Sequence, residues 1–268
     1  MAHRRYKHDP VPRWIEEGKG QGEGANYRPW LGPREGGQLG NVHRILGHTT
    51  GRIHVLFGGN ERSLFYLLDW SDSVLDIREQ YPMDRDVTSA LAEELGIRHP
   101  RIIGTKFVYV MTTDVLATVA TDAGVVHHAF DCKPQSELDK PRVRELLTIH
   151  QEYWKAQHVV WTPVIEKSIH TDTVMNLRWI HPRRSAEFLP TGGRDLGDLL
   201  SSLGAHLRNH PEQGVAASCR CHDLQEGVPP GTSLAIVRHA LATKHWRFNV
   251  TERLDLSRPI AGLSIPPN

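Results

Sequence analysis

Cysteine is scarce in this sequence, and long apolar runs are missing. The 268 residues include three cysteines, too few for a disulfide-stabilised scaffold and consistent with a reducing compartment. No apolar run approaches the roughly 18 residues that cross a bilayer, and no signal-peptide pattern stands at the start. We therefore expect neither a secreted protein nor a membrane protein.

The chain also lacks an excess of charge of one sign, with 32 Lys and Arg against 31 Asp and Glu. The net charge is +4 over residues 1–52, −5 over residues 53–168 and +2 over residues 169–268. An acidic middle between basic flanks suits a carboxylate-rich metal site beside surfaces that tolerate phosphate. An ordinary solvated surface explains charge differences of this size almost as often.

The length predicts about two domains, at roughly 150 residues each. We divide the chain into a basic N-terminal arm (1–52) packing on a catalytic domain (53–168), and a C-terminal domain (169–268). The arm is rich in Gly, Pro and Arg, and is predicted to be irregular. Its glycine run, residues 18–24, lacks the Lys-Ser/Thr pair of a phosphate-binding loop. Lying along DNA and wrapping its own domain are equally consistent with its composition.

Alternating helices and strands are predicted between residues 53 and 168. Asn60, after two glycines, is a plausible N-cap for a short helix. The remaining elements are a helix over 87–95, one or two strands over 106–120, a strand over 125–133, a helix of about seventeen residues around 143–154, and a strand over 158–165. This order predicts an α/β core with a mixed sheet.

The composition changes after Ile169, where we place the domain boundary. Helices over 195–207 and 234–242, followed by a strand over 246–250, outline a mainly α, winged-helix-like domain. Cys219, Cys221 and His222 look like half of a zinc site, but no second Cys/His pair of suitable spacing follows them. Whether the basic residues of this domain touch phosphate or only solvent stays open for Arg238, Lys244 and Arg247.

Acidic residues interrupt two of the predicted apolar faces. Glu61 is the first residue of an i, i+3, i+4, i+7 series completed by Leu64, Phe65 and Leu68. Burying an unpaired charge costs several kcal/mol, so such a residue is either a first-turn residue at the domain edge or a metal ligand. Asp114 shares a strand face with Val110, Thr112 and Leu116, again as a charge in an apolar row.

Asp131 and Lys133 lie two residues apart on the next predicted strand, so both project from one face while Cys132 points away. Glu61, Asp114, Asp131 and Lys133 can therefore converge at one end of the sheet. Carboxylate oxygens of this kind suit Mg²⁺, with Mn²⁺ as an alternative ion. The combination predicts a restriction-endonuclease-like core of the PD-(D/E)xK type. A surface ion pair for Asp131 with Lys133, and a strand-end cap for Asp114, are the structural alternatives.

Six strings of residues, spread in order over nearly the whole chain, are distinctive. They are Glu17-Gly18-Lys19-Gly20-Gln21-Gly22-Glu23-Gly24, Tyr27-Arg28-Pro29-Trp30-Leu31, Thr50-Gly51-Arg52-Ile53-His54, Ser73 to Pro82, Gly96-Ile97-Arg98-His99-Pro100 and Met111-Thr112-Thr113-Asp114. These strings resemble those of the TnsA family, the endonuclease subunits of heteromeric (TnsA/TnsB) cut-and-paste transposases.

The resemblance implies catalytic roles for Glu61, Asp114 and Lys133, which precedes Pro134 as in the family's Gln/Glu-x-Lys-Pro motif. The position two before the lysine is Asp131 here, a shorter side chain that would reach the metal through water. In such folds the backbone carbonyl between the two motif positions, that of Cys132, completes the metal shell with Glu61 and Asp114. The Cys132 side chain is then free to be a small buried hydrophobe.

The resemblance implies Mg²⁺-dependent hydrolysis of the 5′ strand of double-stranded DNA at each transposon end. A TnsB-like transposase would cut and join the 3′ ends, and the C-terminal domain would dock partners including a TnsC-like ATPase regulator. The implied location is the bacterial cytoplasm, on the nucleoid during transposition. Two alternatives remain open, a free-standing restriction or repair nuclease of the same fold and a non-catalytic adaptor that bridges transposase and regulator.

Overall fold

The computed structural model describes residues 6–33, 42–259 and 262–266, and the chain divides into two compact units, Met1–Ile169 and His170–Asn268. The N-terminal unit contains helices α1 (Val11–Glu16), α2 (Gly59–Trp70), α3 (Arg85–Glu94) and α4 (Pro141–Ala156). Its strands are β1 (His43–Leu46), β2 (Ile53–Leu56), β3 (Val74–Pro82), β4 (Thr112–Thr121), β5 (Gly124–Cys132) and β6 (Val160–Val164).

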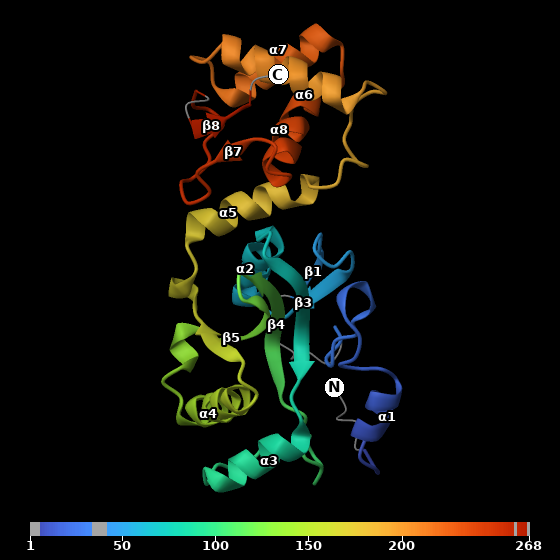
Figure 1. Cartoon of the computed structure of the whole chain (residues 1–268), viewed down its shortest axis with the longest axis vertical. Coiled ribbons are helices and arrows are strands. Elements are labelled where there is room, and N and C mark those ends of the chain that lie inside the picture. The colour runs from blue at the N-terminus through green and yellow to red at the C-terminus, as the bar shows by residue number, and fades with distance from the viewer. Residues whose placement is uncertain (1–5, 34–41, 260–261, 267–268) are drawn as a thin grey trace. The chain divides into compact units, whose positions relative to one another are not determined.

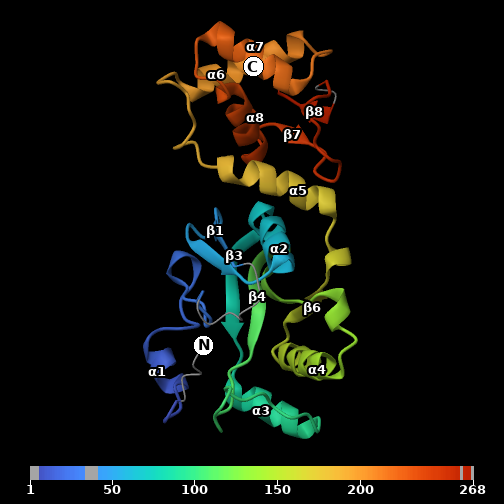
Figure 2. The same cartoon turned by 180° about the vertical axis from the view of Figure 1, so that it is seen from behind.

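A four-stranded sheet in the order β3-β4-β5-β6 forms the centre of the N-terminal unit (Figure 1). The first three strands are antiparallel, whereas β6 returns parallel to β5 after α4. This confirms the mixed sheet expected from the order of elements. β4 begins at Thr112, so residues 106–111 of the one or two strands predicted over 106–120 lie outside it. Figure 2 shows β6 and α4 from the other side.

Helix α2 carries its apolar stripe as predicted, but it begins earlier than predicted. Its N-cap is Gly58, and Asn60 lies inside the first turn. The prediction of Asn60 as the cap was therefore wrong, and its side chain instead donates a hydrogen bond to the backbone oxygen of Lys133, at 3.3 Å. The start of α3 follows the ordinary rule, since Asp84 accepts hydrogen bonds from the backbone of Asp86 and Val87.

The core of the N-terminal unit lies between the sheet and helices α3 and α4. It is a continuous apolar cluster, and burial of this size is the main force that holds the sheet edge and α4 together. Its buried members are Met83, Ala92, Met111, Leu116, Ala129, Ile149, Tyr153 and Trp154. Helix α2 contacts β3 and β4, where Phe65 is fully buried.

The described part of the arm packs against β3. Trp30, 2% exposed, donates its backbone N–H to Gln80, and the Tyr27 hydroxyl donates to the backbone oxygen of Glu79. A Cβ atom on Gly20 would lie 2.3 Å from the Pro82 ring, and Gly20 has a φ of +73°, so this close approach requires glycine. The glycine run thus serves a close contact with the end of β3.

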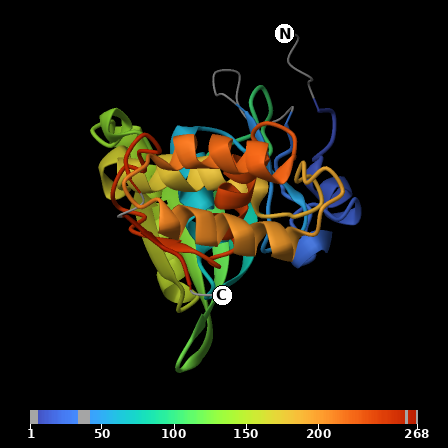
Figure 3. The ribbon, with the colours of Figure 1, turned by 90° about the horizontal axis from the view of Figure 1, so that it is seen from above.

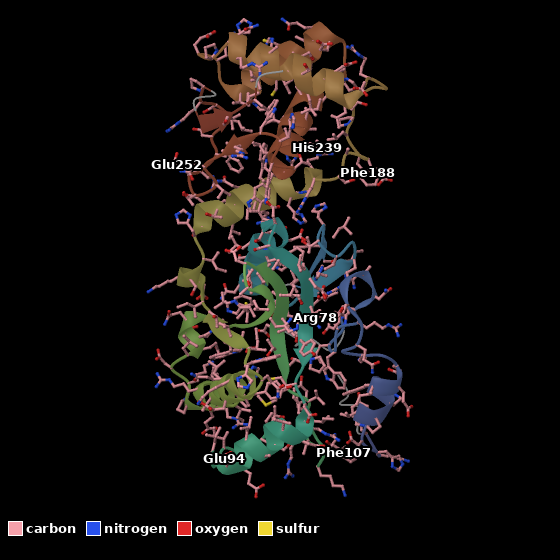
Figure 4. All side chains as sticks on the ribbon, viewed as in Figure 1. Arg78, Glu94, Phe107, Phe188, His239 and Glu252 are labelled. Atoms are coloured by element: carbon pink, nitrogen blue, oxygen red, sulfur yellow. The ribbon has the colours of Figure 1, made fainter. Side chains whose placement is uncertain are left out.

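The residue pattern of 74–82 does not predict β3, because charged side chains are buried along it. Arg78, labelled in Figure 4, is 7% exposed. Its Nε lies 3.5 Å from Asp76 Oδ2, and its guanidinium lies over the Tyr81 ring. Glu79 is fully buried beside Arg52 and His54, with 2.8 Å between Arg52 Nη1 and Glu79 Oε1. The Arg52 and His54 bonds outweigh the effect of burial and lower the pKa of Glu79 to about 2. The Glu79 carboxylate therefore has a structural role, in which it binds Arg52 and His54.

The C-terminal unit contains helices α5 (Thr171–Ile180), α6 (Leu196–Asn209), α7 (Val215–Glu226) and α8 (Thr232–Ala242), and the short strands β7 (Arg247–Phe248) and β8 (Leu263–Ser264). Helices α6, α7 and α8 contact one another, and α5 contacts α8 (Figure 3). The pairing of β7 with β8 is antiparallel and spans two residue pairs. The strand predicted over 246–250 is thus shorter than expected, and the winged-helix assignment stays a prediction.

Candidate active site

A cavity of about 360 Å³ opens where the end of β3, the start of β4 and the end of β5 meet α2 and α4. Five chemically active side chains line it: Glu61, Gln80, Asp114, Lys133 and His150. Mainly apolar side chains complete the wall, among them Leu31 of the arm, Phe57, Met111 and Leu146, and Tyr109 and Thr112 add hydroxyl groups. The cavity brings together three of the four predicted catalytic side chains, with Asp131 as the exception.

Asp114 and Lys133 form the best-defined pair in the cavity. Lys133 Nζ lies 3.1 Å from Asp114 Oδ2 and also 3.1 Å from the Cys132 carbonyl oxygen. The same Asp114 oxygen accepts the backbone N–H of Cys132, at 2.7 Å. These contacts tie the start of β4 to the end of β5, and they fix the direction of both side chains.

The Asp114 pairing keeps Lys133 charged. Burial alone would lower the pKa of Lys133, but the nearby Asp114 and Asp131 carboxylates outweigh it and raise the pKa above its usual value. A lysine held in this state donates hydrogen bonds and does not accept a proton. It can therefore orient a water molecule or a phosphate oxygen through its N–H groups.

Glu61 faces the cavity from the first turn of α2 and is 6% exposed. Its Oε2 accepts the backbone N–H of Phe57 at 2.9 Å. Burial, followed by the negative charge of Asp114, raises the pKa of Glu61 to about 8. The proximity of Asp114 and Glu61 thus concentrates negative charge in a buried place, which a divalent cation would relieve.

Asp131 lies beneath the cavity and is fully buried. Its Oδ2 accepts hydrogen bonds from His150 Nδ1 and Trp161 Nε1, each at 2.6 Å, and its Oδ1 lies 3.3 Å from the Asp114 backbone nitrogen. Burial would raise the pKa of Asp131, but His150 outweighs it and lowers the pKa. Asp131 and Lys133 are therefore held by different partners, although the predicted strand placed them on one face.

The residues of the cavity fit a divalent metal ion. Glu61 and Asp114 offer carboxylate oxygens, and the Cys132 carbonyl oxygen is beside them, within reach of the same lysine. Hard oxygen ligands of this kind suit Mg²⁺ and Mn²⁺. Burial raises the pKa of the Cys132 thiol, so sulfur stays neutral and is a poor ligand here.

Two cavity residues were missed by the sequence analysis. Gln80 has a φ of +49°, in the left-handed region that non-glycine residues rarely adopt, and its Nε2 lies 3.5 Å from Asp114 Oδ1. His150 falls inside the helix predicted around 143–154, for which the sequence indicated no chemical role. Neither residue stands in a spacing pattern that suggests chemistry, because Gln80 lies between two other β3 residues and His150 lies on a helix far from Asp131 in sequence.

Cys219, Cys221 and His222, which look like half of a zinc site in the sequence, all lie on α7, where Cys219 is buried and Cys221 is exposed. The ring nitrogens of His222 are taken by hydroxyl groups, Ser233 Oγ at 2.8 Å and Ser202 Oγ at 2.9 Å. The histidine therefore serves to hold three helices together.

Arg238, one of the basic residues considered for phosphate contact, contacts Trp179 within the C-terminal unit. Its Nε donates to the Trp179 carbonyl oxygen at 2.9 Å, and its guanidinium lies 4.9 Å from the Trp179 ring centroid. Arg247 is exposed. Among the described residues, no helix combines the length and apolarity needed to cross a membrane.

Comparison with known proteins shows that the chain belongs to one family. Residues 71–166 match the family model described as TnsA-like endonuclease N terminal, and residues 168–250 match TnsA endonuclease C terminal. The chain is also 32% identical over 240 residues to the Transposon Tn7 transposition protein TnsA of Escherichia coli. That alignment covers 90% of this chain and 85% of the relative.

Proposed function

Because the chain belongs to the TnsA family and is the DNA endonuclease subunit of a transposase, we propose that its cavity cuts the 5′ strand at transposon ends in a reaction that depends on Mg²⁺. The observation that carries this proposal is the pairing of Lys133 with Asp114 and the Cys132 carbonyl oxygen, with Glu61 facing the same cavity. Two carboxylates and a charged lysine around one space are the parts that phosphodiester hydrolysis needs.

Each side chain has a separate role in this proposal. Glu61, Asp114 and the Cys132 carbonyl oxygen hold the cation, which when bound polarises the phosphate and lowers the pKa of water. The Asp131 contact with that cation, through water, is the part of the predicted ligand set with the least support, because both of its oxygens already accept hydrogen bonds. Mn²⁺ would be accepted by the same oxygen ligands.

Lys133 orients the reacting groups through its N–H donors. A charged ammonium beside the scissile phosphate stabilises the negative charge that develops on its oxygens. In-line attack by water then leaves a 5′ phosphate and a 3′ hydroxyl. The raised pKa of Lys133 supports the donor role, since the ammonium keeps its protons at neutral pH.

The partners follow from the family. We propose that a TnsB-like transposase cuts and joins the 3′ ends, and that the C-terminal unit docks partner subunits, including a TnsC-like ATPase regulator. The substrate is double-stranded DNA at transposon ends. The protein would then act in the bacterial cytoplasm, on the nucleoid.

Strand-resolved cleavage tests the proposal. A transposon-end duplex labelled separately on each strand is incubated with Mg²⁺, with and without the partner transposase. We expect a cut on the 5′ strand only, with a 5′ phosphate and a 3′ hydroxyl, when both subunits and Mg²⁺ are present. Cutting at defined sites by the chain alone would favour a free-standing nuclease. A 5′ strand left intact by the complete assembly would favour a non-catalytic adaptor.

A further inference from the structure

His150 is a buried histidine whose two ring nitrogens have different surroundings. Nδ1 lies 2.6 Å from Asp131 Oδ2, and the residue is 8% exposed. The ring lines the cavity that also contains Asp114 and Lys133. Within residues 6–33, 42–259 and 262–266, no group forms a hydrogen bond with His150 Nε2. This atom is also not fully buried.

Asp131 determines which nitrogen carries the proton. An ionised carboxylate only accepts hydrogen bonds, so Nδ1 must donate. With the proton on Nδ1, the neutral form of an imidazole has its acceptor at Nε2. Trp161 Nε1 donates to the same Asp131 oxygen at 2.6 Å, which fixes the carboxylate, and so the ring orientation is held from two sides.

Two polar neighbours of Asp114 in the cavity, Lys133 and Gln80, are poor acceptors for a water molecule. Lys133 offers only donors, and Gln80 Oε1 already accepts the Thr112 hydroxyl at 3.1 Å. Glu61 and Asp114 serve as cation ligands in the proposed function. An attacking water needs an acceptor for one of its O–H groups if its lone pair is to face phosphorus, and His150 Nε2 is placed to be that acceptor.

We propose that His150 touches the attacking water in the cavity, accepting its hydrogen bond at Nε2, and that Asp131 is a positioning residue that holds the ring through Nδ1. This inference rests on the proposed function of the cavity. The water is oriented from two directions, by the donors of Lys133 and by the acceptor of His150. The departure of this chain from the Gln/Glu-x-Lys pattern then has a structural purpose, because a shorter carboxylate at 131 serves the ring.

Two substitutions of His150 separate the roles of its two nitrogens. H150N keeps a donor near the Nδ1 position for Asp131 but has no atom that reaches the Nε2 position. H150Q places its terminal amide near the Nε2 position. Single-turnover cleavage of the 5′ strand is measured in the full assembly with Mg²⁺, and DNA affinity is measured with Ca²⁺ in its place. Q151N, at the adjacent exposed position on the same helix, is the matched control.

We expect H150N to lower the cleavage rate by about 100-fold, the size of effect that misplacement of a reacting group produces, with DNA affinity unchanged. H150Q should recover at least a tenth of the wild-type rate. D131N should lower the rate similarly, and the double variant D131N/H150N should be no slower than H150N, because both act through one contact. A structural role alone would not produce this pattern.

Failure of the inference can be told from failure of the proposed function. D114A is the reference: if it cuts normally, the cavity is not the active site and both proposals fall. If D114A is inactive while H150N and H150Q both cut within threefold of wild type, only the role of His150 is overturned. The same holds if H150N loses DNA affinity in step with rate, or if D131N and H150N are additive. Should H150N fail to fold, the rate of a folded H150Q near that of D114A overturns it as well.

Discussion

Lys133 Nζ lies 3.1 Å from Asp114 Oδ2, and this contact joins the start of β4 to the residue that directly follows β5. The lysine side chain is 32% exposed and that of Asp114 is 13% exposed, so the pair faces the cavity and is not sealed within the core. A partly buried ion pair of this kind adds little net stability, because desolvation offsets most of the attraction. Its position is better explained by the chemistry of the cavity.

Loss of the Lys133 charge should therefore affect the reaction more than the fold. We expect K133M, which keeps the length of the side chain, to lower the single-turnover rate of 5′-strand cleavage by at least about 100-fold, a typical loss when a group that stabilises developing charge is removed. The melting temperature of the purified variant should differ from that of the wild type by no more than a few degrees. K155M, at an exposed position of α4, is the control, and a normal rate for K133M would remove this residue from the mechanism.

Glu61 makes the stability of the metal-free protein depend on pH. Its folded pKa of about 8 lies above the ordinary value of 4.5, so between these values the folded state retains a proton that the unfolded state has lost. The contribution of Glu61 to stability is therefore complete below pH 4.5 and is lost as the pH rises to about 8.

E61Q removes this dependence while its side-chain oxygen can still accept the Phe57 N–H. In EDTA at pH 8.5 we expect E61Q to be more stable than wild type by at least about 1 kcal/mol, with no gain at pH 4.5. Urea denaturation at the two pH values measures the difference, with E93Q at an exposed site as control. Equal stability of E61Q and wild type at pH 8.5 would contradict the buried, charge-repelled environment described for Glu61.

Divalent cations should stabilise the folded chain through the same carboxylates. Binding to the folded state alone at 100 times the dissociation constant adds about 2.7 kcal/mol, so the melting temperature should rise with Mg²⁺ or Mn²⁺ concentration. D114N should abolish most of this rise, whereas D122N, in the exposed turn after β4, should not. A rise of the same size in D114N would place cation binding elsewhere.

Gln80 combines backbone strain with a position beside Asp114. Its φ of +49° costs a residue with a Cβ atom roughly 1 kcal/mol, and glycine avoids most of this cost. We expect Q80A to be less stable than Q80G, and both to cut more slowly than wild type because the side chain beside Asp114 is lost. Calorimetry and single-turnover cleavage measure the two effects. If Q80A were more stable than Q80G, the assignment of a left-handed conformation to residue 80 would be contradicted.

Much of the fold and part of the site could be predicted from the sequence, because local patterns suffice for them. The stripe containing Glu61 and Phe65 follows helical spacing, and the order of helices and strands implies a mixed sheet. Strand β3 could not be predicted, since its buried charges at Arg78 and Glu79 find partners such as Arg52 only after folding. The bounds of α7 could not be predicted for a related reason, because its buried face includes polar residues such as His222 and Asp223.

The position of Asp131 shows the limit of spacing arguments at the site itself. Alternation along a strand predicts that Asp131 and Lys133 share a face, but it does not reveal that His150 and Trp161 hold one carboxylate while Asp114 holds the lysine. Those partners come from α4, β6 and β4, and the contacts depend on the packing of all three elements. Sequence patterns thus point to candidate residues, and the packing of the three elements determines which contacts each residue makes.

The central claim is that Asp114, with Glu61 and Lys133, forms the site that cuts the 5′ strand. The most direct measurement is cleavage of an end-labelled transposon-end duplex by the assembled transposase containing D114A, in Mg²⁺, with complex formation and 3′-strand cutting recorded in the same reactions. We predict normal assembly and 3′-strand cutting with no 5′-strand product. A 5′-strand product formed at the wild-type rate would contradict it.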